Sequence, residues 1–580
     1  MATRGGAVHV VTTSRTYKDR EYRTHLLRRS FREDGKVRNE TLGNLSHLPD
    51  DLVEVIRRAL KGERFVSAEH AFNATASHAH GHVQAVRSAM QRLGFASLIA
   101  SQPSRERDLV CAMVAARVLA PHTKLATTRW WQSSTLAEEF DVAAADVDAL
   151  YGAMDWLLQR QDTIERKLAK RHLQSGGLVL YDVSSSYFEG CRCPLARIGY
   201  SRDGRKNTPQ VVYGLVTNGQ GCPVAVSVHE GNTSDSKTLL PQVQRLRERF
   251  GIERFVVVGD RGMVSQATID ALRAQEGLDW ITALKSVQIR TLVEDGVLQL
   301  GLFDQRNLFE LTHPDFPGER LVACRNPPLA ERRAHKRREL LEATGKELRA
   351  IQARVSRARQ PLRGEAKIGL SVGRAINRYK MAKHVVLEIA DDRFDFRIDE
   401  DSVRAEATLD GLYVIRSALP PARMAAGDLV RSYKQLAQVE RAFRSLKTVD
   451  LKVRPIHHRL ADRVKSHILL CVLAYYVEWH MKEAWRPLLF ADEDLAAKAT
   501  RDPVAPAQRS KKALEKVYRR TLDDGSPTHS FRTLLADLAT LVRNTCRTTD
   551  APPNAPSFHL TTQASPAQQR AFDLLAKINT

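Results

Sequence analysis

Three acidic residues stand at positions where a carboxylate can do chemistry. Asp182 follows the apolar run LVLY and Asp260 follows FVVVG, so each acid ends a segment that reads as a buried strand. Glu440 lies in the middle of a predicted helix. An acid beside a buried strand carries a desolvation cost and is uncommon without a compensating partner. Two strand-end acids and one helix acid therefore indicate a site that holds metal.

Carboxylate oxygens are hard ligands that suit Mg²⁺ or Mn²⁺. Two such ions, roughly 3.5–4 Å apart, can activate the attacking oxygen and stabilise the leaving oxygen in an in-line phosphodiester displacement. The sequence therefore predicts that Asp182, Asp260 and Glu440 hold two divalent ions. Taken singly, each Asp also fits an ordinary strand-end residue or helix cap, and Glu440 fits an ion-pair partner on an Arg-rich helix.

The predicted helix from about Ala426 to Thr448 carries a second pattern. Tyr433, Glu440 and Lys447 are spaced seven residues apart, almost two helical turns, so all three share one face. Arg444 lies one turn beyond Glu440. A ligand acid flanked by a phenol and cations suits a helix that holds a metal and contacts phosphates. A surface helix with several ion pairs would show the same spacing.

The elements that must position these acids define a fold class. Residues 176–285 are predicted to form three strands, then a helix, a strand, a helix and a strand. Residues 409–480 add another strand and the long helix. This order is the plan of an RNase H-like α/β core. The intervening residues 286–408 read as an inserted α+β subdomain that packs on itself.

The flanking regions are predicted as separate parts. Residues 1–80 read as a small basic β/α region with an Asp34-Gly35 turn, ending in a polar linker. Residues 81–175 read as helical and DNA-binding. Within them, residues 135–157 have the spacing of a helix-turn-helix, although any two packed helices give the same pattern. Residues 481–580 read as a helical region with a frayed, Pro/Ala/Thr-rich tail.

The charge of the chain favours a polyanionic partner such as DNA or RNA. It has 89 Lys and Arg against 67 Asp and Glu, a net charge of +22. A basic protein from a high-pI proteome would show the same balance. Residues 331–383 hold 16 Lys and Arg against 5 Asp and Glu, a surplus of 11 and half of the excess. We predict that their basic face is either a DNA-tracking surface or a solvated helix.

The seven cysteines lack paired CxxC spacing, which argues against a disulfide framework or a zinc ribbon. We expect reduced thiols. The longest apolar run, residues 468–477, is too short to span a bilayer, and the N-terminus lacks an apolar signal core. The sequence therefore predicts a cytoplasmic protein.

Three stretches resemble the catalytic regions of the insertion-sequence-four family of DDE transposases. They are YDVSSSYFEG, GDRGM and the pattern Y-x2-L-x3-E-x6-K formed by Tyr433, Leu436, Glu440 and Lys447. The chain most resembles the branch named after insertion sequence sixteen thirty-four, which PLARIGYSRDGRKNTPQVVYGLVTN and PVAVSVHEGNTSDSKTLLPQV also resemble. The similarity covers residues 178–285 and 410–480, about a third of the chain.

The resemblance implies an RNase H-like catalytic domain with a β-rich insertion between the second and third acids. It implies binding to terminal inverted repeats, hydrolytic nicking, and strand transfer by the exposed 3′-hydroxyl. The DDE roles fall to Asp182, Asp260 and Glu440. Synapsis of two ends implies at least a homodimer in the active complex. The resemblance to a bacterial branch also implies a bacterial, nucleoid-associated protein.

By the same resemblance, Tyr433 and Lys447 contact phosphates near the transposon end. The family commonly has Arg three residues after the Tyr, whereas this sequence has Leu436. One phosphate contact is therefore missing or comes from another cation. The candidates are Arg444, Arg441 and Arg261.

Two other functions are open at this stage. One is a catalytically inactive DNA-binding protein derived from a transposase, against which the intact acidic triad argues. The other is a metal-dependent phosphohydrolase of the aspartyl-phosphate type. Such enzymes need a second Asp two residues after the nucleophile, and here Val183 and Ser184 follow Asp182.

Overall fold

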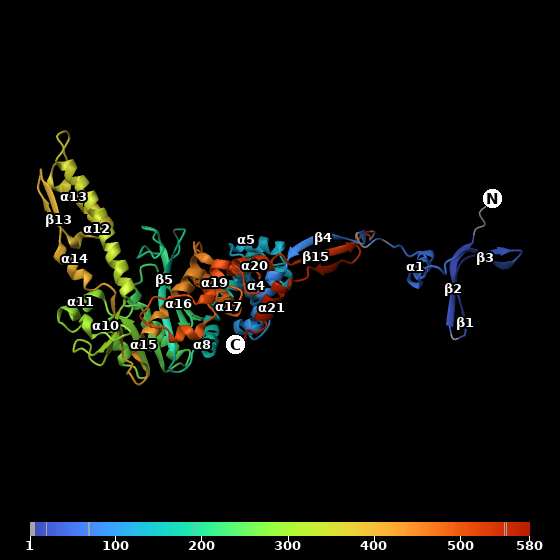
Figure 1. Cartoon of the computed structure of the whole chain (residues 1–580), viewed down its shortest axis with the longest axis horizontal. Coiled ribbons are helices and arrows are strands. Elements are labelled where there is room, and N and C mark those ends of the chain that lie inside the picture. The colour runs from blue at the N-terminus through green and yellow to red at the C-terminus, as the bar shows by residue number, and fades with distance from the viewer. Residues whose placement is uncertain are drawn as a thin grey trace. The chain divides into compact units, whose positions relative to one another are not determined.

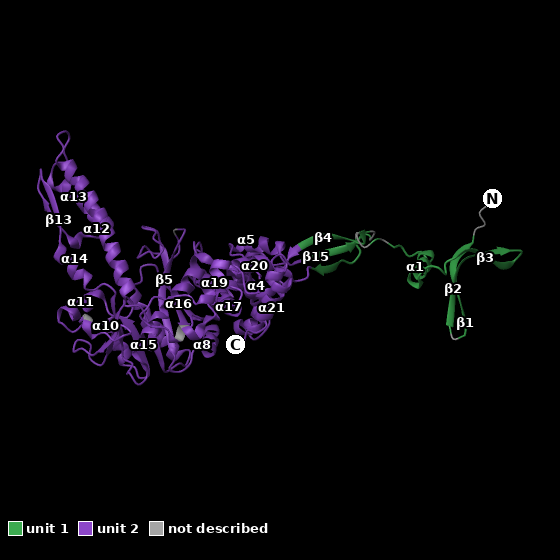
Figure 2. Cartoon of the chain, in the orientation of Figure 1, with its two compact units in different colours: residues 1–77, 543–561 green, residues 78–542, 562–580 purple. Residues whose placement is uncertain are grey.

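The computed structural model describes residues 6–579 except residues 19, 66, 68, 69, 191, 550, 551 and 553. The chain, drawn in Figure 1, divides into two compact units that are distinguished in Figure 2. Unit 1 comprises residues 1–77 and 543–561, and unit 2 comprises residues 78–542 and 562–580.

Unit 1 begins with an antiparallel sheet of β1 (Ala7–Tyr17), β2 (Arg20–Glu33) and β3 (Lys36–Asn44), followed by α1 (Asp50–Leu60). Asp34 and Gly35 have φ values of 50° and 75°, so the two-residue turn between β2 and β3 is the one that Asp-Gly favours. The turn predicted at this dipeptide is confirmed.

A second three-stranded sheet joins distant parts of the chain in the order β16-β15-β4. It contains β4 (Phe72–Ala79), β15 (Val542–Thr548) and β16 (Phe558–Thr561). The sequence predicted a linker at the first of these segments and a frayed tail at the last. The rings of Phe72 and Phe558 pack edge to face with centroids 5.7 Å apart, an apolar contact between segments far apart in the sequence.

Unit 2 is built around a mixed eight-stranded sheet in the order β10-β11-β14-β9-β8-β5-β6-β7. The strands β5 (Leu178–Tyr187), β6 (Gln210–Asn218) and β7 (Pro223–Glu230) form an antiparallel meander. The strands β8 (Phe255–Val258) and β9 (Leu278–Ala283) run parallel to β5. β6 and β8 are buried almost throughout, which explains their continuous apolar sequences. The predicted mixed α/β class is confirmed.

The connections between these strands follow the predicted order. The helix α9 (Leu239–Glu248) joins β7 to β8, and α10 (Gln266–Arg273) joins β8 to β9. The long helix predicted from Ala426 to Thr448 is divided into three parts. It consists of α15 (Ala426–Lys434), α16 (Leu436–Arg444) and a π-helical turn, Ser445–Val449.

The segment from residue 286 to 408 differs from the prediction that it packs on itself. After α11 (Ser286–Glu294), β10 (Leu308–Leu311) and β11 (Arg320–Arg325) extend the main sheet, because β11 pairs with β14 (Leu412–Ser417). A separate apolar core belongs only to the elements that follow. These elements are α12 (Pro327–Val355), α13 (Glu365–Tyr379), β12 (Val385–Ile389), β13 (Phe394–Ile398) and α14 (Glu400–Ala407).

A group of helices precedes β5. They are α2 (Gly81–Arg92), α3 (Phe95–Ile99), α4 (Arg105–Leu119), α5 (Lys124–Trp130), α6 (Leu136–Glu139), α7 (Val147–Leu158) and α8 (Gln161–His172). The later helix α17 (Ala461–Ala484) packs against α4, α7 and β7, so it joins this group to the sheet. The predicted helix-turn-helix corresponds to the four-residue α6 followed by α7.

The last part of unit 2 contains α18 (Leu495–Thr500), α19 (Lys511–Arg519), α20 (Phe531–Leu538) and α21 (Pro566–Leu575). Short 3₁₀ turns occur at Trp131–Ser133, Asp235–Lys237, Leu300–Leu302 and Ala382–His384. Within the described residues, no single helix is long and apolar enough to cross a membrane. The helices Arg105–Leu119 and Lys124–Ser133, which are bent relative to each other, reach the required length and apolar composition only when taken together.

Candidate active site

The two predicted aspartates occupy equivalent positions relative to two neighbouring strands. β5 and β8 are parallel, and Leu180 is paired with Val258. Asp182 and Asp260 each follow this pair by two residues. Asp182 lies within β5 and Asp260 lies two residues beyond the end of β8, so the register places the two residues at the same level on adjacent segments. The sequence predicted that both acids end strands. This is wrong for Asp182, because β5 continues to Tyr187, whereas Asp260 does follow the end of β8. The pairing of β5 with β8 brings the two acids together.

Glu440 reaches the same place from a helix. It is an exposed residue of α16, and α16 packs against β5. The ring of Phe443 on this helix contacts Tyr213 of β6 edge to face, with centroids 5.7 Å apart. Because residues three apart are neighbours on a helix, this contact holds Glu440 at the edge of the sheet, and its side chain stays exposed. The structure therefore gathers all three predicted acids around the middle of β5 and the end of β8.

Burial and the two neighbouring acids disturb the ionisation of Asp182. Burial is the larger cause, and the negative charges of Asp260 and Glu440 add to it, raising the pKa of Asp182 to about 7. The Val183 N–H donates a 2.8 Å hydrogen bond to Asp182 Oδ1, which opposes the shift. A site that concentrates negative charge in this way is suited to a divalent cation.

The spacing of the acids is wider than that of ligands around a single ion. Among the residues that the structure describes, the one group of three or more His, Cys, Asp or Glu with ligand atoms within 4.8 Å of one another is His172, Cys222 and His480. The three acids therefore interact electrostatically, but their oxygen atoms do not all lie within 4.8 Å of one another.

Tyr433 lies beside the second aspartate. Its hydroxyl donates a 3.4 Å hydrogen bond to Asp260 Oδ1. Burial and the negative charge of Asp260 raise the pKa of Tyr433, while the nearby Arg261 lowers it. The phenol is therefore a neutral donor at the edge of the acidic cluster, and Arg261 is the predicted cation that the structure places next to it.

Lys447 lies in the π-helical turn and points back to β5. Its Nζ donates a 2.9 Å hydrogen bond to Ser184 Oγ, two residues after Asp182. It also forms a 2.7 Å ion pair with Asp203, which pairs with Arg454 as well. Burial lowers the pKa of Lys447, and its contact with Asp203 opposes that shift.

The remaining predicted cations are placed differently. Arg441 and Arg444 are exposed residues of α16, and Arg441 Nη1 donates a 3.3 Å hydrogen bond to Gln438. Leu436 is partly buried against the core, which suits an apolar residue where the family commonly has Arg. The structure therefore leaves Arg441 and Arg444 on an open face of α16.

Sequence reasoning missed two members of the site, Arg202 and Asp203. The positive charge of Arg202 lowers the pKa of Asp182, and its Nη2 donates a 2.5 Å hydrogen bond to Asp235. Both residues lie in the stretch SRDG, which the family resemblance already included. The resemblance of that stretch to the family was a signal that these residues could belong to the site. Their contacts could not be predicted, because their partners are distant in the sequence.

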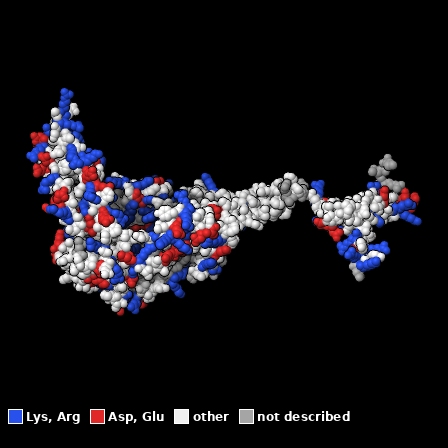
Figure 3. Space-filling view, viewed as in Figure 1, with Lys and Arg blue, Asp and Glu red and all other residues white. Residues whose placement is uncertain are grey.

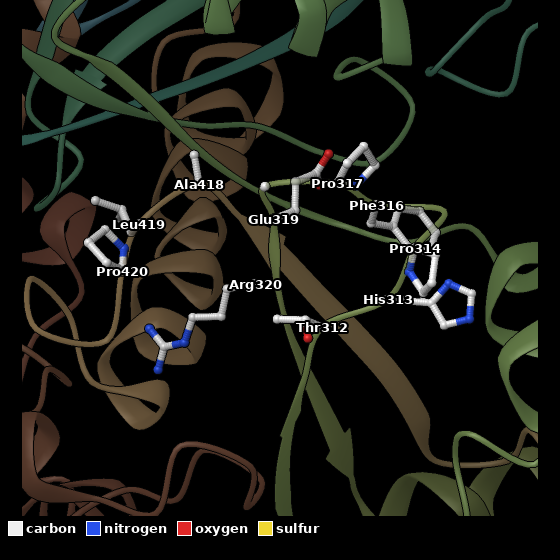
Figure 4. Close-up of a pocket in the computed structure, with 11 residues that line it drawn as sticks. Thr312, His313, Pro314, Phe316, Pro317, Glu319, Arg320, Ala418, Leu419 and Pro420 are labelled. Atoms are coloured by element: carbon white, nitrogen blue, oxygen red, sulfur yellow. The ribbon is translucent and has the colours of Figure 1, made fainter.

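A shallow cavity of about 460 Å³ lies elsewhere on the sheet, and none of the three acids lines it. Figure 4 shows His313 and Phe316 on one side of it, with Leu419 and Pro420 on the other. Its lining carries no grouped carboxylates, so the acidic cluster remains the candidate active site.

Two family models match the chain. The family model of the transposase DDE domain matches residues 188–477, half of the chain. A second model, of the N-terminal domain of IS1634 family transposases, matches residues 10–73. No curated protein matches the chain. Among solved structures, the piggyBac transposase synaptic complex with hairpin DNA aligns with 79% of this chain and 77% of that chain, at 10% identity and a TM-score of 0.34.

The first match begins six residues after Asp182 and includes Asp260 and Glu440. The structural similarity is too low to carry an argument. A mixed α/β sheet with three convergent acids defines a class of candidate metal-dependent nucleases. Within that class, the chain belongs to the DDE transposase family and resembles its IS1634 branch.

Proposed function

We propose that this transposase binds the inverted-repeat ends of an insertion sequence, cleaves the DNA there, and joins the exposed 3′-hydroxyl to target DNA. The observation that carries the proposal is the convergence of three acids. Asp260 and Glu440 both lie close enough to Asp182 for their negative charges to raise its pKa. We assign the catalytic role to residues 176–285 and 409–480, which contain these acids.

The strand order supports an RNase H-like core. Such a core has a three-stranded antiparallel meander whose first strand is central, followed by parallel strands reached through helices. The order β7-β6-β5-β8-β9 has this form, with β8 and β9 parallel to β5. The first acid lies on the central strand, the second just beyond the end of its parallel neighbour and the third on a helix that packs against the central strand, which supports the same correspondence.

The donor set fits Mg²⁺ or Mn²⁺. All three groups are carboxylates, and the raised pKa of Asp182 reflects burial and negative charge that a bound cation would offset. When bound, two ions would polarise the attacking water or hydroxyl and the leaving oxygen of the phosphodiester. The wider spacing of the acids suits a pair of ions better than a single one.

The chain's own groups then have separate tasks. Tyr433 and Arg261 lie at the Asp260 side, where a hydroxyl and a guanidinium can hold a phosphate in register. Lys447 lies at the Asp182 side, fixed by Ser184 and Asp203. Arg441 and Arg444 are exposed on the helix of Glu440 and can contact the DNA strand that leaves the site.

A basic surface beyond the catalytic core is available for flanking DNA. Figure 3 shows Lys and Arg side chains on the projection formed by α12 and α13. Exposed cations on α12 include Arg332, Arg333, Lys336 and Arg338. We assign DNA contacts to this projection and to residues 1–80 and 81–175, and we propose a homodimer in the complex that holds two ends.

The test is cleavage of DNA carrying the inverted termini found beside the gene, in Mg²⁺ and in Mn²⁺. We expect Asp182→Asn, Asp260→Asn and Glu440→Gln each to lower the cleavage rate about 1000-fold or more, because each removes a ligand of the charge-stabilising ions. Binding of the same DNA should persist in all three variants.

The matched control is Glu230→Gln. Glu230 is an exposed acid at the end of β7 in the same sheet, paired with Arg197 at 3.8 Å. We expect cleavage within about twofold of the wild type, since an exposed pair contributes little. Wild-type protein that binds these ends in either metal but never cuts them would instead establish an inactive DNA-binding protein.

A further inference from the structure

One thiol and two imidazoles meet outside the acidic cluster. His172 ends α8, Cys222 immediately precedes β7, and His480 lies in α17. The three residues come from segments far apart in the sequence, yet each offers a ligand atom within 4.8 Å of the others. Among the residues that the structure describes, this is the one such group.

The distances suit a soft or borderline metal ion. Cys222 Sγ lies 3.9 Å from His480 Nε2. A tetrahedral ion with Zn–S of about 2.3 Å and Zn–N of about 2.0–2.1 Å would place these two atoms about 3.6 Å apart. Small side-chain movements are therefore enough to bring the sulfur and the nitrogen onto one ion.

The surroundings hold the ligands in place. Cys222 and Tyr476 are fully buried, and His480 is 8% exposed. The Tyr476 hydroxyl lies 3.1 Å from His172 Nε2, and its ring packs edge to face on His480. Polar partners of this kind orient the imidazoles of metal sites.

The two imidazoles are in the form that binds a metal ion, whereas the thiol would have to lose its proton. Burial lowers the pKa of His172 to about 4 and that of His480 to about 3, so both rings are neutral at pH 7. Burial also raises the pKa of the Cys222 thiol, so an ion that binds there displaces one proton from the sulfur. Two charged groups lie close to the three ligands. The positive charge of Arg171 disfavours binding of a cation, and the negative charge of Glu483 favours it.

We propose that His172, Cys222 and His480 bind one Zn²⁺ ion with a structural role. Two imidazoles and a thiolate are the donors that zinc prefers, whereas Mg²⁺ prefers the carboxylates of the other site. The fourth position is left to water. The ion would fasten the end of α8 and the C-terminal part of α17 to the turn between β6 and β7.

That turn supports the helix of the third acid. Gly221, next to Cys222, has a φ of 87°, and a Cβ at this position would lie 2.8 Å from Gln438 Cβ. Only glycine allows this close approach. Because Gln438 lies two residues before Glu440, an ion at Cys222 would fix the surface on which α16 rests.

The test uses untagged, full-length, reduced protein freed of metal. We expect one zinc per chain after dialysis against zinc, a rise in melting temperature with zinc, and a thiolate-to-cobalt charge-transfer band when Co²⁺ replaces it. Excess Mg²⁺ should not compete. Cys222→Ala should lose the band and the zinc-dependent rise. His172→Gln should weaken both the band and the zinc-dependent rise. Because His172 is only half-buried, this variant can replace Cys222→Ala in the test if Cys222→Ala does not fold.

Cys471→Ala is the matched control. Cys471 is another buried thiol on α17, and its Sγ lies at the same 3.9 Å from one imidazole, that of His467, without a second His in the group. It should keep the band, as should Asp182→Asn, which separates this proposal from the catalytic one. Wild-type protein without the band, or a band that survives in Cys222→Ala, would overturn the zinc site.

Discussion

The ammonium group of Lys447 lies 2.7 Å from a carboxylate oxygen of Asp203, whose side chain is 2% exposed. Arg454 forms a second ion pair with the same carboxylate. Burial raises the pKa of Asp203, but Arg454 and Lys447 outweigh it and hold that pKa below its ordinary value. Asp203 is therefore a charged anchor between a loop and the π-helical turn that carries Lys447.

Replacing this anchor should destabilise the protein. Asp203→Asn leaves two poorly exposed cations without a counter-charge, and we expect the free energy of unfolding to fall by about 3 kcal/mol. Urea unfolding measures the change. Asp155→Asn is the control, since Asp155 forms a 3.6 Å pair with Arg463 in which the two side chains are 48% and 32% exposed. Its loss should cost less than about 1 kcal/mol. Equal effects of the two substitutions would contradict the anchoring role.

The raised pKa of Asp182 predicts how metal-free stability depends on pH. The pKa is 3.8 ordinarily and about 7 in the folded chain, chiefly because of burial. The folded protein thus binds this proton more tightly, so the associated stability is present at low pH and is lost as pH rises through about 7. Asn cannot ionise and avoids that loss.

We therefore expect Asp182→Asn to be more stable than the wild type at pH 8 in EDTA, by up to about 4 kcal/mol, with the difference shrinking toward pH 5. Mg²⁺ should raise the melting temperature of the wild type and not that of the variant. Thermal unfolding across this pH range gives both results. A pH-independent difference would show that Asp182 keeps an ordinary pKa.

A buried ion pair connects β14 to the residue that precedes β11. Arg416 of β14 donates two 2.5 Å hydrogen bonds to Glu319, and the two side chains are 6% and 1% exposed. Glu319→Gln should lower the free energy of unfolding by about 3–5 kcal/mol, because it leaves a buried guanidinium without its counter-charge.

The double variant Glu319→Leu with Arg416→Met is the informative comparison for that pair. It removes both charges at once and should be less destabilised than Glu319→Gln alone, as measured by urea unfolding. Additive losses from the single substitutions would mean that the two side chains act independently.

The acids of the candidate site were accessible to sequence reasoning because their strands are strongly apolar. Asp182 and Asp260 each stand out against a buried run, and Glu440 lies in a recognisable pattern with Tyr433 and Lys447. What the sequence could not supply was the register that pairs Leu180 with Val258 and so brings the two aspartates side by side.

Contacts between distant segments account for most of what was missed. Asp203 meets Lys447 across 244 residues, and nothing local in either segment indicates the partner. The strand β11 was assigned to a separate insertion because its pairing with β14 bypasses the long helices between them. The grouping of Cys222 with two histidines is of the same kind. The periodicity of apolar residues indicates which face of a helix or strand is buried, but it does not indicate which other element covers that face.

The predicted frayed tail is a different kind of error, since a local signal was present. Ser565 and Gln568 form a capping box at the start of α21, and Pro566 occupies its first turn. Leu575 and Ala571 are fully buried, and Trp485 Nε1 donates a 2.9 Å hydrogen bond to the Ala571 carbonyl. The compositional bias of the segment masked a short capped helix that docks on the core.

This docking yields a direct prediction. Leu575→Ala removes a fully buried side chain and should lower the free energy of unfolding by about 2–5 kcal/mol. Lys577→Ala, two residues further along and exposed, should change it by less than about 0.5 kcal/mol. Urea unfolding followed by the fluorescence of the tryptophans, Trp485 among them, reports both. If the chain end were frayed, the two substitutions would be equally silent, because neither side chain would have a packed neighbour to lose.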